Sequence, residues 1–283
     1  MSEQPLPFIY QFLAGAIAGV SEILLMYPLD VVKTRQQLDT TGSYTGTVQT
    51  FKKIIKDEGF SRLYKGITSP ILMEAPKRAT KFAANDEWGK FYRSLFDVPK
   101  MTQPLAVLTG ATAGATESFV VVPFELIKIR LQDKSSKFNG MLDVSKHIIK
   151  TNGIFGLYKG LESTLWRHVA WNAGYFGLIF QVKELMPQPK NSTEKTLIDL
   201  TSGAIGGTFG TMLNTPFDVV KSRIQAGDIK YKWTVPSLFV IGKEEGFSAL
   251  YKGFLPKVLR LGPGGGVLLV VFTTCMDFFR SIQ

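Results

Sequence analysis

The feature that most constrains this chain is one structural unit written three times. Strings of the form P-x-[DE]-x-x-K-x-R begin at Pro28, Pro123 and Pro216, at offsets of 95 and 93 residues. A glycine-rich string starts 13 residues before each proline, and a string ending in Tyr-Lys-Gly ends 37 or 38 residues after it. Because three motifs recur at matched spacing, the units are predicted to share one fold. We expect a single domain, 1–283, built from repeats 1–100, 101–190 and 191–283.

Each unit is predicted to hold two long helices joined by a basic loop. The first helices are mostly apolar stretches of about 20 residues, long enough to cross the roughly 30 Å hydrocarbon layer; they are expected at 8–29, 105–127 and 197–220. The second helices are more amphipathic and are expected at 67–92, 161–186 and 254–280. Short amphipathic helices are predicted in the loops, at 47–56, 143–150 and 236–244. The predicted fold is an all-α membrane protein with six transmembrane helices in three tandem two-helix repeats and pseudo-threefold symmetry.

Positive charge is concentrated on one side of the predicted spans. Of the 33 Lys and Arg residues, the loops within the three units hold seven, seven and six, whereas the two loops between units hold few. This asymmetry is typical of membrane proteins. It argues against a soluble helical bundle, which the helical pattern alone leaves open. Both termini are expected on the less basic side.

Composition excludes several classes of protein. Cys275 is the only cysteine and there are two histidines, which excludes a disulfide scaffold and a Cys/His zinc site. No nucleophile–base pair or metal cluster is visible, so we expect no enzyme activity, cofactor or metal. The Lys and Arg residues flank apolar spans instead of lining a soluble face, so nucleic acid is not an expected partner.

Charged residues follow each motif proline, which itself is expected to kink its helix. The acids are Asp30, Glu125 and Asp218, and the bases three residues later are Lys33, Lys128 and Lys221. Acid and base share a helix face, and unpaired charge at a bilayer edge is costly. We therefore expect a ring in which each acid meets the base of the next unit. Three glutamines are placed to hydrogen-bond beneath it: Gln37, Gln132 and Gln225.

Glycines four residues apart lie on one face of each first helix. The pairs are Gly15 and Gly19, Gly110 and Gly114, and Gly203 and Gly207. Small residues let helix backbones approach closely in lipid. The sequence therefore predicts helix-packing sites at these positions.

Cations and acids also occur inside the predicted spans. The cationic candidates are Lys77, Arg78, Lys81, Arg167, His168 and Arg260. Such residues normally face a water-filled cavity or a partner, and their excess predicts an anionic solute with more than one carboxylate. Snorkelling or local pairing is the alternative, and Glu74 is placed to pair with Arg78. Glu22 and Glu117 are candidates either to carry a co-transported proton or to balance cavity lysines.

The three copies of P-x-[DE]-x-x-[KR]-x-[KR], followed by strings like [DE]-G-x-x-x-x-[YFW]-[KR]-G, resemble the mitochondrial carrier family over essentially the whole chain. The resemblance implies a monomeric, multi-pass exchanger of the mitochondrial inner membrane that works by alternating access. The basic loops would then face the matrix and both termini the intermembrane space. It also implies a matrix gate made of Asp30–Lys128, Glu125–Lys221 and Asp218–Lys33, with the three glutamines as braces.

The resemblance also implies where substrate binds, since the family's contacts lie on the second helices. It places Lys77, Arg78, Lys81, Arg167, His168 and Arg260 at the substrate. The pair Arg167-His168 is similar to keto-acid and carboxylate carriers, which implies exchange of the 2-oxodicarboxylates 2-oxoadipate and 2-oxoglutarate. Carriers of citrate or malate, and a membrane adaptor without transport, remain alternatives. The expected partners are these anions and membrane lipid, with cardiolipin a candidate at the matrix side.

Two departures from the family pattern stand out. Asn152 replaces the acid of the second [DE]-G string. The cytosolic gate of the family, an acid and a base three apart on each second helix, is reduced to one pair, Asp86–Lys183. We therefore expect a weak cytosolic gate.

Overall fold

The long helices of the computed structural model form three tandem pairs. The structure describes residues 7–186, 192–227 and 230–282, and these contain helices but no strand. The long helices are α1 (Phe8–Leu38), α3 (Thr68–Leu95), α4 (Gln103–Gln132), α6 (Leu161–Leu185), α7 (Ser192–Ala226) and α9 (Phe254–Ser281). The predicted fold, six transmembrane helices in three two-helix repeats, is confirmed.

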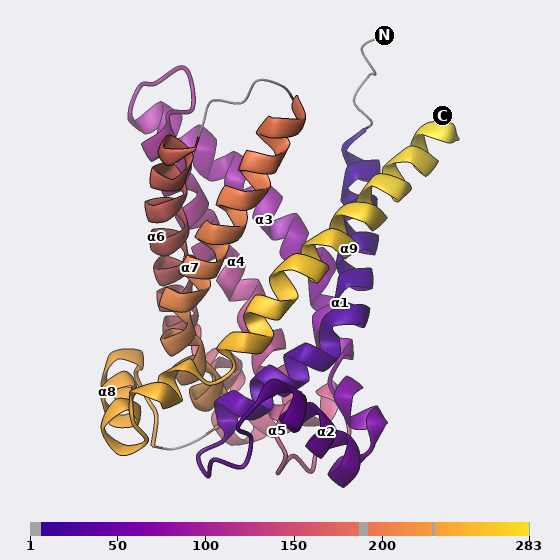
Figure 1. The fold of residues 1–283 in the computed structure, drawn as a ribbon, viewed down its shortest axis with the longest axis vertical. Coiled ribbons are helices and arrows are strands. Elements are labelled where there is room, and N and C mark those ends of the chain that lie inside the picture. The colour runs from indigo at the N-terminus through magenta and orange to yellow at the C-terminus, as the bar shows by residue number, and fades with distance from the viewer. Residues whose placement is uncertain (1–6, 187–191, 228–229, 283) are drawn as a thin grey trace.

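Short helices gather at one end of the molecule. They are α2 (Thr47–Glu58), α5 (Met141–Asn152) and α8 (Thr234–Glu244), each followed by a 3₁₀ helix: η1 (Phe60–Tyr64), η2 (Ile154–Tyr158) and η3 (Phe247–Tyr251). We call this the loop end (Figure 1). The start of α1 and the end of α9 lie at the opposite end, which we call the terminal end.

Neighbouring helices close a circle. α3 packs along α4, α6 along α7, and α1 along α9. The first two pairs are consecutive in the chain, whereas α1 and α9 come from its opposite ends. In Figure 1 the long helices converge at the loop end and spread apart toward the terminal end.

The first helices continue past their predicted ends. They stop at Leu38, Gln132 and Ala226, about two turns beyond the apolar runs. The prediction was wrong because it ended each helix where the apolar run ends. These last turns instead pair their charges with each other and pack their apolar side chains on the loop helices.

Apolar packing is concentrated at the loop end, in one cluster per repeat. Each cluster joins the last turns of a first helix to the loop helix of the same repeat. The first contains Val31, Ile54 and Leu63, the second Leu126, Val144 and Ile148, and the third Val220, Ile241 and Leu250. Burying one such side chain contributes about 1.5–3 kcal/mol, so these clusters fix the first helices against the loops.

The glycine of each Tyr-Lys-Gly string has two structural reasons to be glycine. Gly66, Gly160 and Gly253 have φ of 87°, 87° and 80°, which favours glycine. An added Cβ would also lie 3.0 Å from Leu131, 2.8 Å from Gln225 and 3.1 Å from Gln37, respectively. Each contact is with the first helix of the next repeat, so the glycines let the repeats approach closely.

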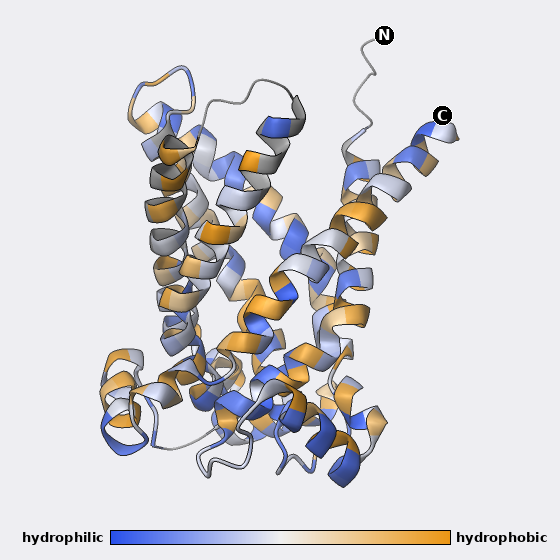
Figure 2. Ribbon diagram, viewed as in Figure 1, coloured by the Kyte–Doolittle hydropathy of each residue, from blue (hydrophilic) through white to orange (hydrophobic). Residues whose placement is uncertain are grey.

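Hydrophobic residues recur along the long helices (Figure 2), and several large ones are exposed, as expected of a surface that faces lipid. Leu25 on α1 and Val270 on α9 are 61% and 63% exposed. Among the described residues, three stretches are long and apolar enough to span a membrane on composition alone: Ile9–Leu38, Pro104–Gln132 and Phe247–Ser281. The last was expected to be amphipathic, so for α9 that expectation was wrong.

The predicted glycine packing sites are largely wrong. A Cβ added to Gly110, Gly114, Gly203 or Gly207 would meet no atom of the described residues within 4 Å, its own helix backbone aside. At Gly19 the space is filled by the Glu74 and Arg78 side chains, not by a helix backbone. The close backbone contact occurs instead between α6 and α7, where a Cβ on Gly210 would lie 2.9 Å from the Trp171 carbonyl oxygen.

We predict that Gly210→Ala destabilises the protein by about 1–3 kcal/mol, because the new methyl group overlaps backbone that has no free rotation. Gly207→Ala on the same helix is the matched control, and should leave stability unchanged or slightly raised because alanine favours helix. Thermal unfolding in detergent measures both. Equal midpoints for the two variants would contradict the close contact.

Candidate functional site

A charged cavity of about 800 Å³ lies between the six long helices, each of which contributes to its lining. It extends from the loop-end charges Asp30 and Lys33 to residues such as Asn85 and Val107 in the terminal half. Among the described residues, five cationic side chains line it: Lys33, Lys81, Arg167, Lys257 and Arg260. Three described acidic side chains line it: Glu22, Asp30 and Glu117. The described lining therefore carries a surplus of two positive charges.

Three ion pairs between repeats form the floor of this cavity. The lysine Nζ to carboxylate distances are 2.7 Å for Lys128–Asp30, 2.5 Å for Lys221–Glu125 and 2.6 Å for Lys33–Asp218. Each acid thus meets a base of another repeat, in the pairs expected from the sequence. The three pairs join α1, α4 and α7 into a closed ring at the loop end.

The three glutamines beneath the ring are not equivalent. Gln37 donates to Asp218 Oδ2 at 3.1 Å and accepts from Ser222 at 2.7 Å, so it braces a ring acid. Gln132 accepts a hydrogen bond from Thr34 at 2.6 Å. Gln225 is fully buried, and within the described part of the chain neither of its side-chain polar atoms has a hydrogen-bond partner. Only Gln37 therefore bonds to a ring carboxylate among the described contacts.

Each ring acid also meets a cation that lines the cavity. Arg260 Nη1 lies 2.5 Å from Asp30. Arg167 lies 3.9 Å from both Glu125 and Asp218. Lys257 Nζ lies 3.3 Å from Asp218. The floor is thus connected by ion pairs to the groups that a solute in the cavity would meet.

Arg167 is the least firmly held of these cations. Its Nη2 lies 3.3 Å from His168 Nε2, and its buried Nε forms no hydrogen bond with any residue that the structure describes. His168 also lines the cavity. An arginine with an unused donor is able to accept a carboxylate without first giving up a hydrogen bond.

The three cations predicted on α3 separate into two groups. Lys81 lines the cavity. Lys77 and Arg78 instead bind Glu74, at 2.5 Å and 2.7 Å, and are not part of the lining. Glu74 is almost completely buried against α1, beside Gly19. Because a buried carboxylate is costly unless it is paired, both cations bind it. The structure therefore does not place Lys77 and Arg78 at the cavity.

The two intramembrane acids both line the cavity but differ in whether they are paired with a cation. Glu22 accepts hydrogen bonds from Arg260 Nε and Nη2 at 3.0 Å and 2.7 Å. Glu117 lines the cavity but forms no ion pair or hydrogen bond within the described part of the chain. Glu22 therefore balances a cavity cation, whereas Glu117 faces the cavity unpaired.

Two functional candidates were missed by the sequence analysis. Lys257 on α9 donates to Asn214 Oδ1 on α7, and both side chains line the cavity. Their repeat equivalents carry no charge, so the repeat pattern gave no reason to select them. A lysine inside a predicted span, four residues after a Tyr-Lys-Gly string, was the available signal.

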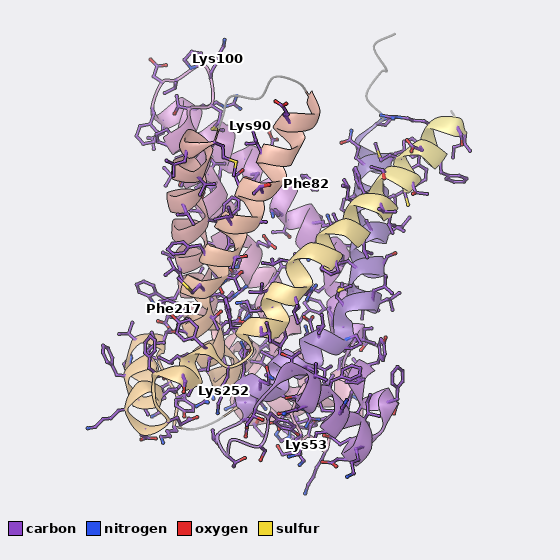
Figure 3. The ribbon with its side chains drawn as sticks, in the orientation of Figure 1. Lys53, Phe82, Lys90, Lys100, Phe217 and Lys252 are labelled. Atoms are coloured by element: carbon purple, nitrogen blue, oxygen red, sulfur yellow. The ribbon has the colours of Figure 1, made fainter. Side chains whose placement is uncertain are left out.

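The expected terminal-end pair, Asp86–Lys183, stays a prediction. Asp86 binds Lys90 of the same helix at 2.6 Å, and both are exposed. Lys90 lies near the terminal end, on the opposite side from Lys252 (Figure 3). The side chain of Lys183 lies outside the described residues. Asp86 therefore forms a local surface pair.

A membrane-spanning helical barrel with a charged cavity closed at one end is typical of a solute transporter. The sequence matches the mitochondrial carrier protein family over residues 4–95, 100–190 and 192–283. The chain therefore belongs to the mitochondrial carrier family.

Several relatives match nearly the whole chain. Mitochondrial citrate transporter D of Aspergillus niger is 64% identical, covering 100% of this chain and 98% of the relative. Mitochondrial 2-oxodicarboxylate carrier 1 of Saccharomyces cerevisiae is 59% identical over 100% and 97%. The mitochondrial 2-oxodicarboxylate carrier of Bos taurus is 44% identical over 93% and 91%.

We predict that Asp30→Asn destabilises the closed floor by at least about 1 kcal/mol more than Lys128→Met, although both break the same ring pair. Asparagine at position 30 leaves Lys128 without a carboxylate and Arg260 with Glu22 alone, whereas methionine at 128 leaves Asp30 paired with Arg260. Thermal unfolding without added solute measures the difference. A larger effect of Lys128→Met would contradict the two-cation arrangement.

Proposed function

We propose that this protein exchanges 2-oxodicarboxylates, such as 2-oxoglutarate and 2-oxoadipate, across the mitochondrial inner membrane by alternating access. The observation that carries the proposal is the surplus of two positive charges in the described cavity lining. This surplus would balance the two negative charges of a dicarboxylate dianion. Two relatives described above are named for the same solutes. The basic loop end would face the matrix, with both termini in the intermembrane space.

The chemistry of binding follows from the cavity cations. Arg167 offers an unused Nε donor, and Lys81 lies on the same lining. A guanidinium suits a carboxylate because it donates two parallel hydrogen bonds. One carboxylate would bind Arg167, while the other would compete with Asp30 and Glu22 for Arg260, or with Asp218 for Lys257.

That competition supplies a route from binding to opening. A ligand shifts a conformational equilibrium only through its different affinity for the two states. A solute carboxylate that takes over a cavity cation weakens the contacts holding the floor closed. The floor residues, together with Gln37, Gln132 and Gln225, would then act as a gate on the matrix side. The protein would work as a monomer surrounded by lipid, with cardiolipin at the matrix side.

Citrate is the second candidate solute, because a relative 64% identical is named a citrate transporter. Citrate carries three carboxylates, one more than the surplus cavity charge would balance. A membrane adaptor with this fold but without transport is the alternative of another class. The exchange assay below separates all three.

Purified protein in liposomes loaded with 2-oxoglutarate should take up labelled 2-oxoglutarate, and unlabelled 2-oxoadipate should compete better than citrate or malate. Arg167→Ala should lower apparent affinity roughly 10- to 100-fold, because it removes a charged hydrogen-bond donor. Lys77→Ala is the comparison variant, because Lys77 is not part of the cavity lining. Uptake driven only by citrate would favour the second candidate, and no uptake at all would favour the adaptor.

We further propose Glu117, and not Glu22, as the carrier of a co-transported proton. Glu117 faces the cavity unpaired, whereas Glu22 is held by Arg260. Glu117→Gln should remove the effect of an imposed pH gradient on uptake while keeping exchange; Glu22→Gln should keep that effect. Wild-type uptake that ignores the pH gradient would rule out a coupled proton.

A further inference from the structure

The arginine of the repeated motif has a different environment in the second repeat. In the first repeat, Arg35 is buried and binds Glu58 at 2.7 Å, with its Nη1 3.5 Å from the Tyr44 hydroxyl. In the third repeat, Arg223 is equally buried. It binds Glu245 at 2.9 Å through Nη2, and its Nη1 lies 3.1 Å from the Tyr231 hydroxyl. In both repeats a carboxylate and a phenol bind the guanidinium.

These arginine–carboxylate links are ionic. Burial favours the neutral carboxyl of Glu245, but hydrogen bonds from Arg223 and its charge more than offset this and lower the pKa of Glu245. The link ties the last turn of a first helix to the end of its loop helix. It therefore helps to fasten the loop end of each of these repeats.

The second repeat lacks both partners of its arginine. Asn152 stands in place of the glutamate and Phe138 in place of the tyrosine. Arg130 is half-buried, and its one described hydrogen bond runs from Nε to the Gln225 carbonyl oxygen at 3.3 Å. No carboxylate of the described residues forms an ion pair with it. Loss of both partners together leaves a cation that needs an acceptor.

A cavity of about 520 Å³ opens at this position. Its lining consists of Arg130, Asn152, Phe155, Gly156, Tyr158, Lys159 and Gly227. Phe155 and Gly156 also depart from the repeat pattern, which has Ser and then Arg or Ala there. A Cβ on Gly156 would lie 2.6 Å from Asn152 Cβ. The departures of the second repeat are thus gathered around one cavity.

We propose that Arg130 binds a small external anion in this cavity, through a carboxylate or phosphate group that replaces the missing glutamate side chain. The guanidinium offers a planar pair of donors for such a group, and Lys159 adds a second cation to the lining. The bound anion would tie α4 to the α5–η2 segment as Glu58 ties α1 to α2. The site shares no lining residue with the central cavity.

Two substitutions of matched size test the proposal. Asn152→Glu supplies a tethered carboxylate, and Asn152→Gln is its neutral control; both keep the Cβ that Gly156 approaches. Without added anion, Asn152→Glu should unfold at a higher temperature than Asn152→Gln. With inorganic phosphate or 2-oxoglutarate, the midpoint of wild type and Asn152→Gln should rise more than that of Asn152→Glu. The central cavity is intact in all three, so equal responses would overturn the proposal.

Chemical labelling of the wild-type chain gives a second, independent measurement. Phenylglyoxal should modify Arg130 faster than the buried Arg35 and Arg223, and a bound anion should slow that reaction severalfold. Protection by inorganic phosphate indicates a soluble anion, and protection only by cardiolipin micelles indicates a lipid headgroup. Protection by neither would overturn the proposal.

One further variant tests for an acid within the chain. Asp228 directly follows the lining residue Gly227 in the sequence. Asp228→Asn should leave the labelling rate of Arg130 unchanged. Faster labelling in that variant would show that an internal acid already fills the role of the anion, and would overturn the proposal. None of these measurements uses solute exchange, so their failure is distinct from failure of the proposed function.

Discussion

Three ion pairs between repeats determine how the rest of this structure is assembled. Each joins the first helix of one repeat to the first helix of another, at distances of 2.5–2.7 Å. Burying such charges adds little net stability, but leaving one of them unpaired is expensive. The pairs therefore act mainly by selecting one arrangement of the three repeats. The glycines of the Tyr-Lys-Gly strings allow the approach that this arrangement needs.

The position of the ring acids makes the floor sensitive to what the cavity contains. Asp30, Glu125 and Asp218 each face a lysine of the ring and also a cation of the cavity. A purely structural ring would not need the second set of contacts. Because both sets share the same carboxylates, a change in charge in the cavity alters the environment of the ring.

The sequence was sufficient to predict features that the three repeats share. Acids and bases at equivalent positions on a threefold scaffold have few ways to pair, so the repeat spacing indicated the ring. Features that occur once were harder to predict. Lys257 has no charged equivalent, and the separation of Lys77 and Arg78 from the cavity depends on where the buried Glu74 lies.

The ends of the helices and the contacts between them could not be predicted from the sequence pattern either. Hydropathy ended the first helices too early, since their last turns are stabilised by ion pairs and loop helices that a linear scan does not register. Glycine spacing indicated the wrong packing site, because Gly210 lies against Trp171 of α6, whereas a Cβ on Gly203 or Gly207 would meet no described neighbour within 4 Å. Both errors concern three-dimensional neighbours, which local sequence does not encode.

The seam between α1 and α9 has a particular consequence for the architecture. The other two extensive helix contacts, α3 with α4 and α6 with α7, join helices that are neighbours in the chain. The contact between α1 and α9 joins the two ends of the chain. Arg260 bridges it, holding Glu22 and Asp30 of α1 from its place on α9. This guanidinium adds two ionic contacts to the packing of α9 along α1, so the chain's two end helices are held together by charge as well as by packing.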